Sequence, residues 1–417
     1  MVNRPVRIAH LGLGAFFRAH QAWYTAHAPD ADSWGIAAFT GRSPAMADAL
    51  NAQGRRYTLI ARRAEGDHAE IIPVVTEAHP GGDDEAWHAT MSAPELAVVT
   101  LTVTEAGYEP TSAIPGRLLA GLRARRAAGG GPLALVSCDN LPENGNALRI
   151  AVQGAAGDDA DLREWIDAHI SFVSTVVDRI TPATTPEDRA VAQALTGWAD
   201  RCPVVTEPFS EWLLAGEFPS GRPQWDVAGA RFIDDVEVYE RRKLWLLNGA
   251  HSLLAYAGAT RGHATVAEAM HDEVCAAWVE QWWDAAARHL ELDGTEVSDY
   301  RAALTARFTN PRIQHQLAQI GMDGSRKLPV RAFPVLRAEL AAGREAVGPA
   351  RLLAGWIRHL RGDTFEVRDP SAGEFTEAAR GPLDQAVRSV LGGLDEELAA
   401  DDRVVRLVAD LTTELSP

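Results

Sequence analysis

The sequence predicts two domains, an α/β domain built on a parallel sheet and, after it, a mostly α-helical domain. A short apolar strand at residues 6–11 leads directly into a Gly-Leu-Gly turn and a helix. Further apolar, β-branched strands alternate with helices, a pattern typical of a parallel sheet covered on both faces. The strand signal almost disappears after residue 235. We therefore expect domains over residues 1–235 and 236–417, in agreement with the usual size of one domain.

Each expected element follows from its local pattern: strands from apolar runs, helices from 3.6-residue periodicity, and boundaries from turn residues and N-caps such as Ser43. In the first half we expect strands at 6–11, 36–39, 96–103 and 132–137, helices at 15–28, 44–53, 117–128, 145–156 and 162–177, a hairpin-like insertion at 57–75, and short extended pieces at 203–206 and 230–233. In the second half we expect helices at 266–290, 297–307, 310–321, 349–360 and 382–391.

The composition is that of a globular protein, 46% hydrophobic and 23% charged, with a formal net charge of −17. Such a surface repels polyanions, so we expect neither nucleic-acid nor membrane partners. The three cysteines are far apart and lack metal-ligand spacing, which predicts neither a disulfide framework nor a metal site. No signal peptide and no apolar run of about 18 residues is evident. We expect a cytoplasmic monomer or small homo-oligomer.

The glycine turn after the first strand is the first candidate site. Gly12 and Gly14 allow a tight turn whose backbone N–H groups can approach a pyrophosphate, and Phe16 follows directly. The third glycine of the GxGxxG motif is replaced by Phe17, so a larger side chain must be accommodated where strand and helix pack. The turn predicts dinucleotide binding, although a purely structural turn has the same pattern.

The end of the second strand bears on the choice of cofactor. An acidic residue there usually binds the adenosine ribose of NAD, whereas a basic residue meets the 2′-phosphate of NADP. Here the sequence is Phe39-Thr40-Gly41-Arg42-Ser43. Arg42 favours NADP(H), or tolerance of both NAD(H) and NADP(H), unless it is a solvated loop cation.

Polar residues follow two further strands, where ligands collect in open α/β sheets. Thr104 and Glu105 come after the strand at 96–103, and Asn140 follows the strand at 132–137. We expect these side chains at the edge of the sheet that carries the glycine turn. The alternative is that they are ordinary polar loop tips.

A helix at residues 240–256 carries four polar groups, Glu240, Lys243, Asn248 and His251, within about 140° of arc. A lysine desolvated by apolar neighbours can act as general acid and base for an alcohol and ketone pair. Asparagine amides can stabilise a developing alkoxide. The alternative is a surface Glu240–Lys243 pair and a buried structural histidine.

A basic cluster in an expected turn between helices is the last candidate. His315, Lys327 and Arg331 stand close together in the sequence of a strongly acidic chain. Such cations could hold a substrate carboxylate or phosphate. A solvated loop is the alternative.

Several blocks in order resemble the polyol-specific long-chain dehydrogenases, a family that includes mannitol 2-dehydrogenase and the fructuronate and tagaturonate reductases. The resemblance spans most of the chain through the blocks HLGLGAFFRAH, LTVTEAGY, SCDN with NGN, VVDRITPAT, VVTEPF, KLWLLNGAHS and DGSRKLP. It implies a Rossmann-like N-terminal domain, a mostly helical C-terminal domain, and an active site between them. It also implies a lysine in place of the zinc of other alcohol dehydrogenases.

The resemblance implies a role for each matching residue. Lys243 is the general acid and base, Asn140 and Asn248 form an oxyanion-type site, and His251 binds substrate. Glu240 joins the proton path, and Asp178 lies near the nicotinamide. One departure is Trp245, which stands where the family usually has arginine; we expect a packing change there.

The block NPRIQHQLAQIGMDGSRKLPVR is more similar to the hexuronate reductases than to the mannitol enzymes. A uronate carboxylate suits His315, Lys327 or Arg331. We therefore expect reduction of a keto-hexuronate such as fructuronate to mannonate. Interconversion of mannitol and fructose, a sugar-phosphate dehydrogenase, and a catalytically silent binding protein are the alternatives.

Overall fold

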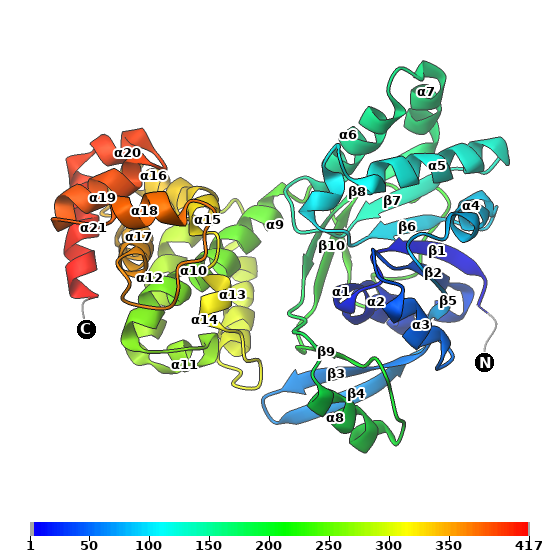
Figure 1. The fold of residues 1–417 in the computed structure, drawn as a ribbon, viewed down its shortest axis with the longest axis horizontal. Helices are drawn as coiled ribbons and strands as arrows, with labels where there is room; N and C mark the ends of the chain where they lie inside the picture. Colours follow the sequence, from blue (N-terminus) through cyan, green and yellow to red (C-terminus); the bar gives the residue numbers. More distant parts are fainter. Residues whose placement is uncertain (1–3, 416–417) are drawn as a thin grey trace. The chain divides into compact units, whose positions relative to one another are not determined.

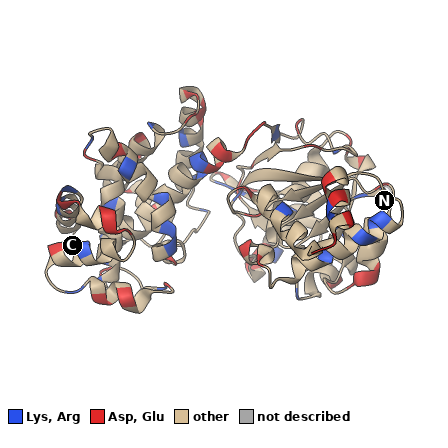
Figure 2. Cartoon of the chain, turned by 90° about the horizontal axis from the view of Figure 1, so that it is seen from above, with Lys and Arg blue, Asp and Glu red and all other residues tan. Residues whose placement is uncertain are grey.

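The computed structural model describes residues 4–415, and the chain divides into two compact units, Met1–Glu237 and Val238–Pro417. Acidic and basic residues occur in both units (Figure 2). No helix among residues 4–415 combines the length and the hydropathy needed to span a membrane.

A large sheet organises the N-terminal unit (Figure 1), in the strand order β11-β10-β8-β7-β6-β1-β2-β5. Its strands β1, β2, β5, β6, β7 and β8 are parallel, and β10 runs antiparallel to β8. Residues of β1, β2, β6 and β7 are buried almost throughout, which is why they read as continuous apolar runs. The strands are β1 (Val6–Leu11), β2 (Gly35–Phe39), β5 (Val75–His79), β6 (Val98–Leu101), β7 (Leu133–Ser137), β8 (Ile170–Asp178), β10 (Glu211–Ala215) and β11 (Arg231–Phe232).

Two hydrophobic cores lie on opposite faces of this sheet because successive side chains of a strand alternate between faces. Ile8 enters one core, and its neighbour Ala9 enters the other. Figure 1 shows the helices divided in the same way. On the Ile8 side are α1 (Ala15–Ala19), α2 (Gln21–His27) and α3 (Ala45–Asn51); on the Ala9 side are α4 (Asp84–Ser92), α5 (Ala113–Ala127), α6 (Asn144–Ala156) and α7 (Ala160–His169). The predicted parallel sheet covered on both faces is confirmed.

The expected hairpin is confirmed as β3 (Tyr57–Arg63) and β4 (Gly66–Ile72), which pair antiparallel. The structure adds β9 (Val204–Thr206), which pairs parallel with β3 and completes a separate three-stranded sheet. Helix α8 (Pro186–Thr196) is attached to this sheet by a salt bridge between Arg62 and Asp188.

The predicted helix at 162–177 is wrong in its second half. Helix α7 ends at His169, and β8 begins at the next residue. The segment ISFVSTVVD is rich in β-branched residues and pairs with β7 on one side and β10 on the other, so sheet pairing decides its conformation. The predicted helix at 15–28 is interrupted at His20, which separates α1 from α2.

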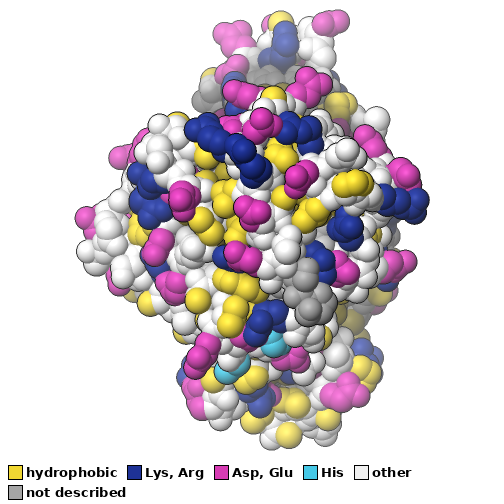
Figure 3. All heavy atoms as spheres, turned by 90° about the vertical axis from the view of Figure 1, so that its left-hand side faces the viewer, with side chains coloured by type: hydrophobic (Ala, Val, Ile, Leu, Met, Phe, Trp, Pro, Cys, Tyr) yellow, Lys and Arg dark blue, Asp and Glu magenta, His cyan; other side chains and the backbone are white. Residues whose placement is uncertain are grey.

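The C-terminal unit is helical, as expected. Among its described residues, β-pairing is limited to one isolated bridge between Thr265 and Gln316. The face drawn in Figure 3 mixes charged and hydrophobic side chains. The helical segments of the C-terminal part of the chain are α9 (Glu237–Arg242), η3 (Lys243–Gly249), α10 (Ala250–Leu253), η4 (Leu254–Gly258), η5 (Ala259–Arg261), α11 (Val266–His271), α12 (Glu273–Ala287), α13 (Gly294–Phe308), α14 (Leu317–Ile320), α15 (Gly324–Arg331), α16 (Phe333–Ala341), α17 (Val347–Leu360), α18 (Ala372–Ala378), α19 (Leu383–Gly392), α20 (Glu396–Ala400) and α21 (Asp402–Glu414).

Two predictions between residues 310 and 331 are wrong. The expected helix at 310–321 is reduced to α14, and the basic cluster expected in a turn contains α15. The carboxylate of Asp369 accepts hydrogen bonds from the backbone N–H of Ser325 (2.7 Å) and from its hydroxyl (2.6 Å), which caps the start of α15. A cap supplied by a residue so far along the chain has no local sequence signal.

Asn144 connects three elements at the carboxyl edge of the large sheet, so we expect Asn144→Ala to destabilise the N-terminal unit. Its side chain is fully buried, donates to the carbonyls of Asp139 (2.9 Å) and Thr175 (2.8 Å), and accepts from the Thr175 N–H (2.9 Å). Losing these bonds should lower the free energy of unfolding by about 2–4 kcal/mol, measured by chemical denaturation. Asn146→Ala on the same helix removes solvent-exposed hydrogen bonds to Glu143 and Arg149 and is the control. Equal effects of the two substitutions would contradict the assignment.

Candidate active site

The glycine turn after β1 has a geometry that requires glycine at its first position. Gly12 has φ +106°, and a Cβ there would lie 2.1 Å from the carbonyl oxygen of Thr102. The N–H groups of Gly12 and Leu13 both donate to the carbonyl of Phe39, at 3.0 and 2.9 Å. The turn is thereby fixed to the end of β2. Gly14 has an open environment, with only the Gly12 carbonyl oxygen within 4 Å of a built Cβ, at 3.5 Å.

Phe17, which replaces the third glycine of the motif, is accommodated by a histidine on β1. Its ring stacks on the imidazole of His10 with centroids 3.6 Å apart. His10 is fully buried and hydrogen-bonds to the hydroxyls of Thr100 (2.8 Å) and Thr102 (3.1 Å). Thr102 in turn donates to the carbonyl of Gly12 (2.9 Å). The aromatic ring therefore belongs to a buried set of contacts that supports the turn.

A cleft of about 960 Å³ opens beside the glycine turn, a volume suited to a large ligand. It is lined by predicted cofactor residues Gly12, Gly14, Arg42 and Thr104. The open environment of Gly14 fits the close backbone approach that a dinucleotide needs.

Three other predicted cofactor residues do not line this cleft. Phe16 stacks on His20 with ring centroids 5.0 Å apart. Glu105 is exposed and begins a 3₁₀ turn after β6. Asp178 is buried at the last position of β8, opposite Glu211 of β10.

Asn140 is exposed and directly follows a buried aspartate that joins neighbouring strand ends. Asp139 accepts hydrogen bonds from the N–H groups of Val103 (3.1 Å) and Thr104 (2.7 Å) and from the hydroxyl of Tyr108 (2.7 Å). Burial raises the pKa of Asp139, and these hydrogen bonds partly oppose the shift. The loop before Asn140 is therefore attached to the loop that carries Thr104.

The helix that carries Lys243 is continuous from α9 to η4 but changes its winding. Lys243–Gly249 and Leu254–Gly258 are π-helical, and the residues at their junctions keep right-handed helical torsions. In a π-helix hydrogen bonds connect residues five apart, so Lys243 and Asn248 are about one turn apart. At 3.6 residues per turn, as in an α-helix, the two side chains would be separated by a wider angle around the helix. Glu240, Lys243 and Asn248 are half-buried.

Two tryptophans of α12 hold this π-helical segment. The indole N–H groups of Trp282 and Trp283 donate to the carbonyls of Trp245 and Leu246, both at 2.8 Å. Gly249 leaves room for the first indole, since a Cβ there would lie 2.3 Å from Trp282. Trp245 is itself buried, as the expected packing change requires.

His251 is buried in the C-terminal unit. Its ring stacks on Phe308 (centroids 4.6 Å apart) and meets the ring of His315 edge-on at 4.9 Å. Burial holds the pKa of His251 well below its usual value, and the nearby cations Arg307 and Arg331 add to the effect. The imidazole is therefore neutral at pH 7. Its Nε2 has no hydrogen-bond partner within the described chain, although it is buried.

Two of the three predicted substrate residues, His315 and Arg331, lie near this histidine, and Lys327 lies near Arg331. Burial lowers the pKa of His315, and its buried Nδ1 has no partner among residues 4–415. Arg331 donates to the hydroxyl of Ser252 (3.0 Å) and to the carbonyl of Asn248 (3.4 Å), while Lys327 donates to the carbonyl of Ile320 (3.3 Å). Burial lowers the pKa of Arg331 to about 10 and also lowers that of Lys327, on which Arg331 acts as well.

Sequence reasoning missed Arg307, Phe308 and Ser252 at this site. Phe308 stacks on His251, and Ser252 accepts a hydrogen bond from Arg331. Arg307 lowers the pKa of both His251 and His315. Arg307 and Phe308 close α13 just before the Asn310-Pro311 pair, and Ser252 is the residue after His251 in the helix. The sequence could have indicated these three residues only because they are close to Asn310 or His251 along the chain.

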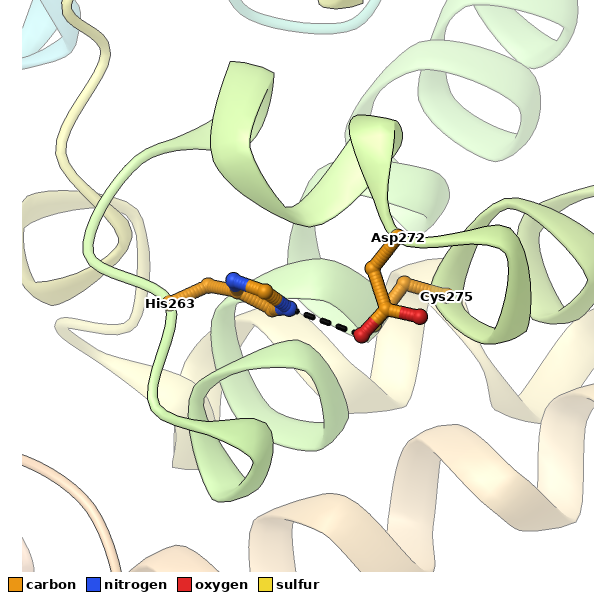
Figure 4. A group of neighbouring side chains, drawn as sticks. All are labelled: His263, Asp272 and Cys275. Carbon is orange, nitrogen blue, oxygen red and sulfur yellow. Dashed lines mark hydrogen bonds and ion pairs between the residues drawn. The ribbon is translucent and has the colours of Figure 1, made fainter.

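One group of potential metal ligands, His263, Asp272 and Cys275, lies elsewhere in the C-terminal unit (Figure 4). Arg261 donates to both carboxylate oxygens of Asp272, at 2.6 and 3.2 Å, and Asp272 also caps α12 by accepting from the Val274 N–H (2.9 Å). Burial raises the pKa of the Cys275 thiol to about 12. A metal needs a thiolate and available carboxylate lone pairs, so these contacts indicate a helix cap.

Comparison with known proteins shows the family to which the chain belongs. Residues 6–227 match the mannitol dehydrogenase Rossmann domain, and residues 235–415 match the mannitol dehydrogenase C-terminal domain. The chain therefore belongs to the mannitol dehydrogenase family and is an oxidoreductase with a Rossmann-type domain for NAD(H) or NADP(H).

Individual relatives agree with this assignment. The chain is 37% identical to D-mannonate oxidoreductase of Escherichia coli, over 88% of this chain and 84% of the relative. It is 36% identical to mannitol 2-dehydrogenase of Cereibacter sphaeroides, over 89% and 86%. Among solved structures, the ternary complex of Pseudomonas fluorescens mannitol 2-dehydrogenase with NAD and D-mannitol has a TM-score of 0.81 and 31% identity, covering 99% of this chain and 92% of that one.

The buried state of His10 predicts a pH dependence of stability. Burial lowers its pKa to about 3, whereas an unfolded histidine titrates near pH ~6.5. Between these values the unfolded state binds the extra proton. The contribution of His10 is therefore fully present above about pH 6.5 and falls with decreasing pH by about 1.4 kcal/mol per unit.

We expect His10→Gln to reduce this slope between pH 6.5 and 5, measured by urea unfolding at each pH. His68→Gln removes an exposed imidazole and is the control. An unchanged slope in His10→Gln would contradict the neutral assignment.

Proposed function

We propose that this chain reduces a keto-hexuronate, such as fructuronate, to the corresponding aldonate, such as mannonate. The family supports dehydrogenase chemistry on a polyol or sugar acid, and the similarity to D-mannonate oxidoreductase covers most of both chains. The observation that supports the choice of a sugar acid is the pair of neighbouring cations on α15, Lys327 and Arg331, of which Arg331 lies near His251. In the described residues neither cation forms a salt bridge with a carboxylate, and both are half-buried.

The proposed chemistry uses the polar face of the Lys243 helix. The nicotinamide cofactor supplies the hydride when bound. Lys243 gives its proton to the alkoxide that forms as the ketone is reduced, and Glu240 connects the lysine with solvent. Asn248, on the same helix as Lys243, donates a hydrogen bond to this oxygen. No metal is required for this proton transfer.

His251 has a separate proposed role in holding the substrate. Because its imidazole is neutral and its Nε2 is unsatisfied in the described structure, it can exchange one hydrogen bond with a sugar hydroxyl. His315, whose ring centroid lies 4.9 Å from that of His251, offers a second unsatisfied nitrogen. Satisfying these buried atoms contributes to binding, because each costs free energy while unpaired.

Mannitol and fructose interconversion is the second candidate, favoured by the similarity to mannitol 2-dehydrogenases. An uncharged polyol would form no ion pair with Lys327 or Arg331. The carboxylates of Asp323 and Asp369 act on Lys327 but form no salt bridge with it in the described structure. A sugar phosphate would pair with Lys327 and Arg331 as a uronate does. Rates with fructuronate, tagaturonate, fructose and fructose 6-phosphate distinguish these substrates, and activity with fructose but with neither uronate would reject our first choice. A silent binding protein would turn over none of them.

Replacing Lys243 by alanine should lower kcat by at least about 100-fold, the low end for a positioned acid and base. Cofactor affinity should change little, because the predicted cofactor cleft lies in the N-terminal unit. Steady-state kinetics give the first quantity and cofactor fluorescence titration the second. Turnover close to that of the unmodified protein would remove Lys243 from its proposed role.

Lys327→Ala should raise KM for a keto-hexuronate by about 10-fold or more, as expected when one charge-assisted hydrogen bond is lost. KM for fructose should change little. Arg326→Ala removes an exposed cation from the same helix and is the matched control. If Arg326→Ala and Lys327→Ala raise KM equally, or if fructose is affected as strongly, the carboxylate contact is wrong.

A further inference from the structure

The part of the cleft next to β2 differs from an NAD site in its charge. The loop after β2 contains Thr40, Gly41, Arg42 and Ser43, with no carboxylate, and the exposed side chain of Arg42 lines the cleft. Guanidinium has five donors and no acceptor, so it cannot accept hydrogen bonds from a ribose diol. It is suited to a phosphate.

A second loop supports the first and keeps this end of the cleft open. The N–H of Gly81 donates to the hydroxyl of Thr40 (2.9 Å), and a Cβ on Gly81 would lie 2.0 Å from the carbonyl oxygen of Gly41. The two backbones are therefore packed together. Gly41 and Gly82 have nothing within 4 Å of a built Cβ, so space remains beside Arg42.

A second guanidinium lines the same cleft and lacks an acceptor. Arg117 of α5 is held against aromatic rings, with its guanidinium carbon 5.2 Å from the ring centres of Phe39 and Trp87. Its Nε and Nη2 are buried and have no hydrogen-bond partner in the described chain. Leaving these donors unpaired costs free energy, and phosphate oxygens would satisfy them in the paired geometry that arginine prefers.

The only acidic residue that lines the described cleft is Asp84, which is exposed in the first turn of α4. A second carboxylate, Asp83, also acts on Arg117, but it accepts a hydrogen bond from the Ala86 N–H as the cap of α4. Asp84 is the group that could accept from a ribose diol instead. Binding of an unphosphorylated ribose by Asp84, as in an NAD(H) site, is therefore the competing outcome.

We propose that Arg42 and Arg117 form a binding site for the 2′-phosphate of the adenosine ribose, and that this chain prefers NADP(H) to NAD(H). The inference deepens the proposed function and rests on its assignment of the cleft to the cofactor. It assigns Arg117 a role in cofactor specificity that the glycine motif and the residues at the end of β2 do not reveal.

The test measures binding without sugar and without turnover. Isothermal titration of the full chain with 2′,5′-ADP and with 5′-AMP compares two ligands that differ by the 2′-phosphate. We expect 2′,5′-ADP to bind at least about 10-fold more tightly, the effect of one strong charged contact. Arg42→Ala and Arg117→Met should each remove most of this difference and leave 5′-AMP affinity within about threefold.

The controls separate this inference from the proposed function. Arg126→Ala removes an exposed cation from α5 and should leave the preference unchanged. Arg42 is exposed, so its substitution tests the site even where Arg117→Met unfolds the protein. Binding of 5′-AMP as tightly as 2′,5′-ADP, with Asp84→Asn weakening 5′-AMP, would overturn the NADP(H) preference alone. Failure of both ligands to bind would reject the cofactor assignment of the cleft as well.

Discussion

The hydrogen bonds from the Trp282 and Trp283 indoles to the backbone of η3 are the interaction on which the Lys243 face depends. Winding with hydrogen bonds between residues five apart is rare, since α-helical spacing is normally favoured. Here two indole donors engage the carbonyls of Trp245 and Leu246, and Gly249 lets the Trp282 ring approach the backbone. Because of this winding, Lys243 and Asn248, five residues apart in the sequence, lie about one helical turn apart.

The N-terminal unit uses buried polar side chains for a similar purpose. His10 supports the glycine turn through Thr102, and Asp139 attaches neighbouring strand ends through backbone N–H groups. These side chains have their hydrogen bonds satisfied inside the protein. His251, His315 and Arg117 differ, because each keeps a buried nitrogen without a partner in the described structure.

Much of the fold could be predicted because its signals are local. The glycine turn, the apolar strands β1, β2 and β7 and the β3–β4 hairpin all depend on short-range patterns. By contrast, β8 could not be separated from a preceding helix, because pairing with β7 and β10 decides its conformation. Helix α15 was missed because its cap comes from Asp369, which lies more than 40 residues away. The candidate site residues could be selected because they belong to recognisable sequence motifs. Arg117 belongs to no such motif, and the aromatic rings that surround it, Phe39 and Trp87, come from other elements.

The net charge of the chain and the charge of the cations in its candidate sites have opposite signs. A chain of net charge −17 repels anionic ligands at long range, but salt screens that repulsion beyond about 10 Å. Inside a pocket screening is weaker, so a few half-buried cations decide the local potential. Arg117 in the N-terminal unit and Lys327 and Arg331 in the C-terminal unit are such cations, and burial lowers the pKa of each. Burial lowers these pKa values because the charged forms are incompletely solvated, and an anionic ligand compensates that loss. Desolvation therefore makes the charged form of each side chain less stable on its own. It also strengthens the electrostatic attraction between that side chain and a bound phosphate or carboxylate.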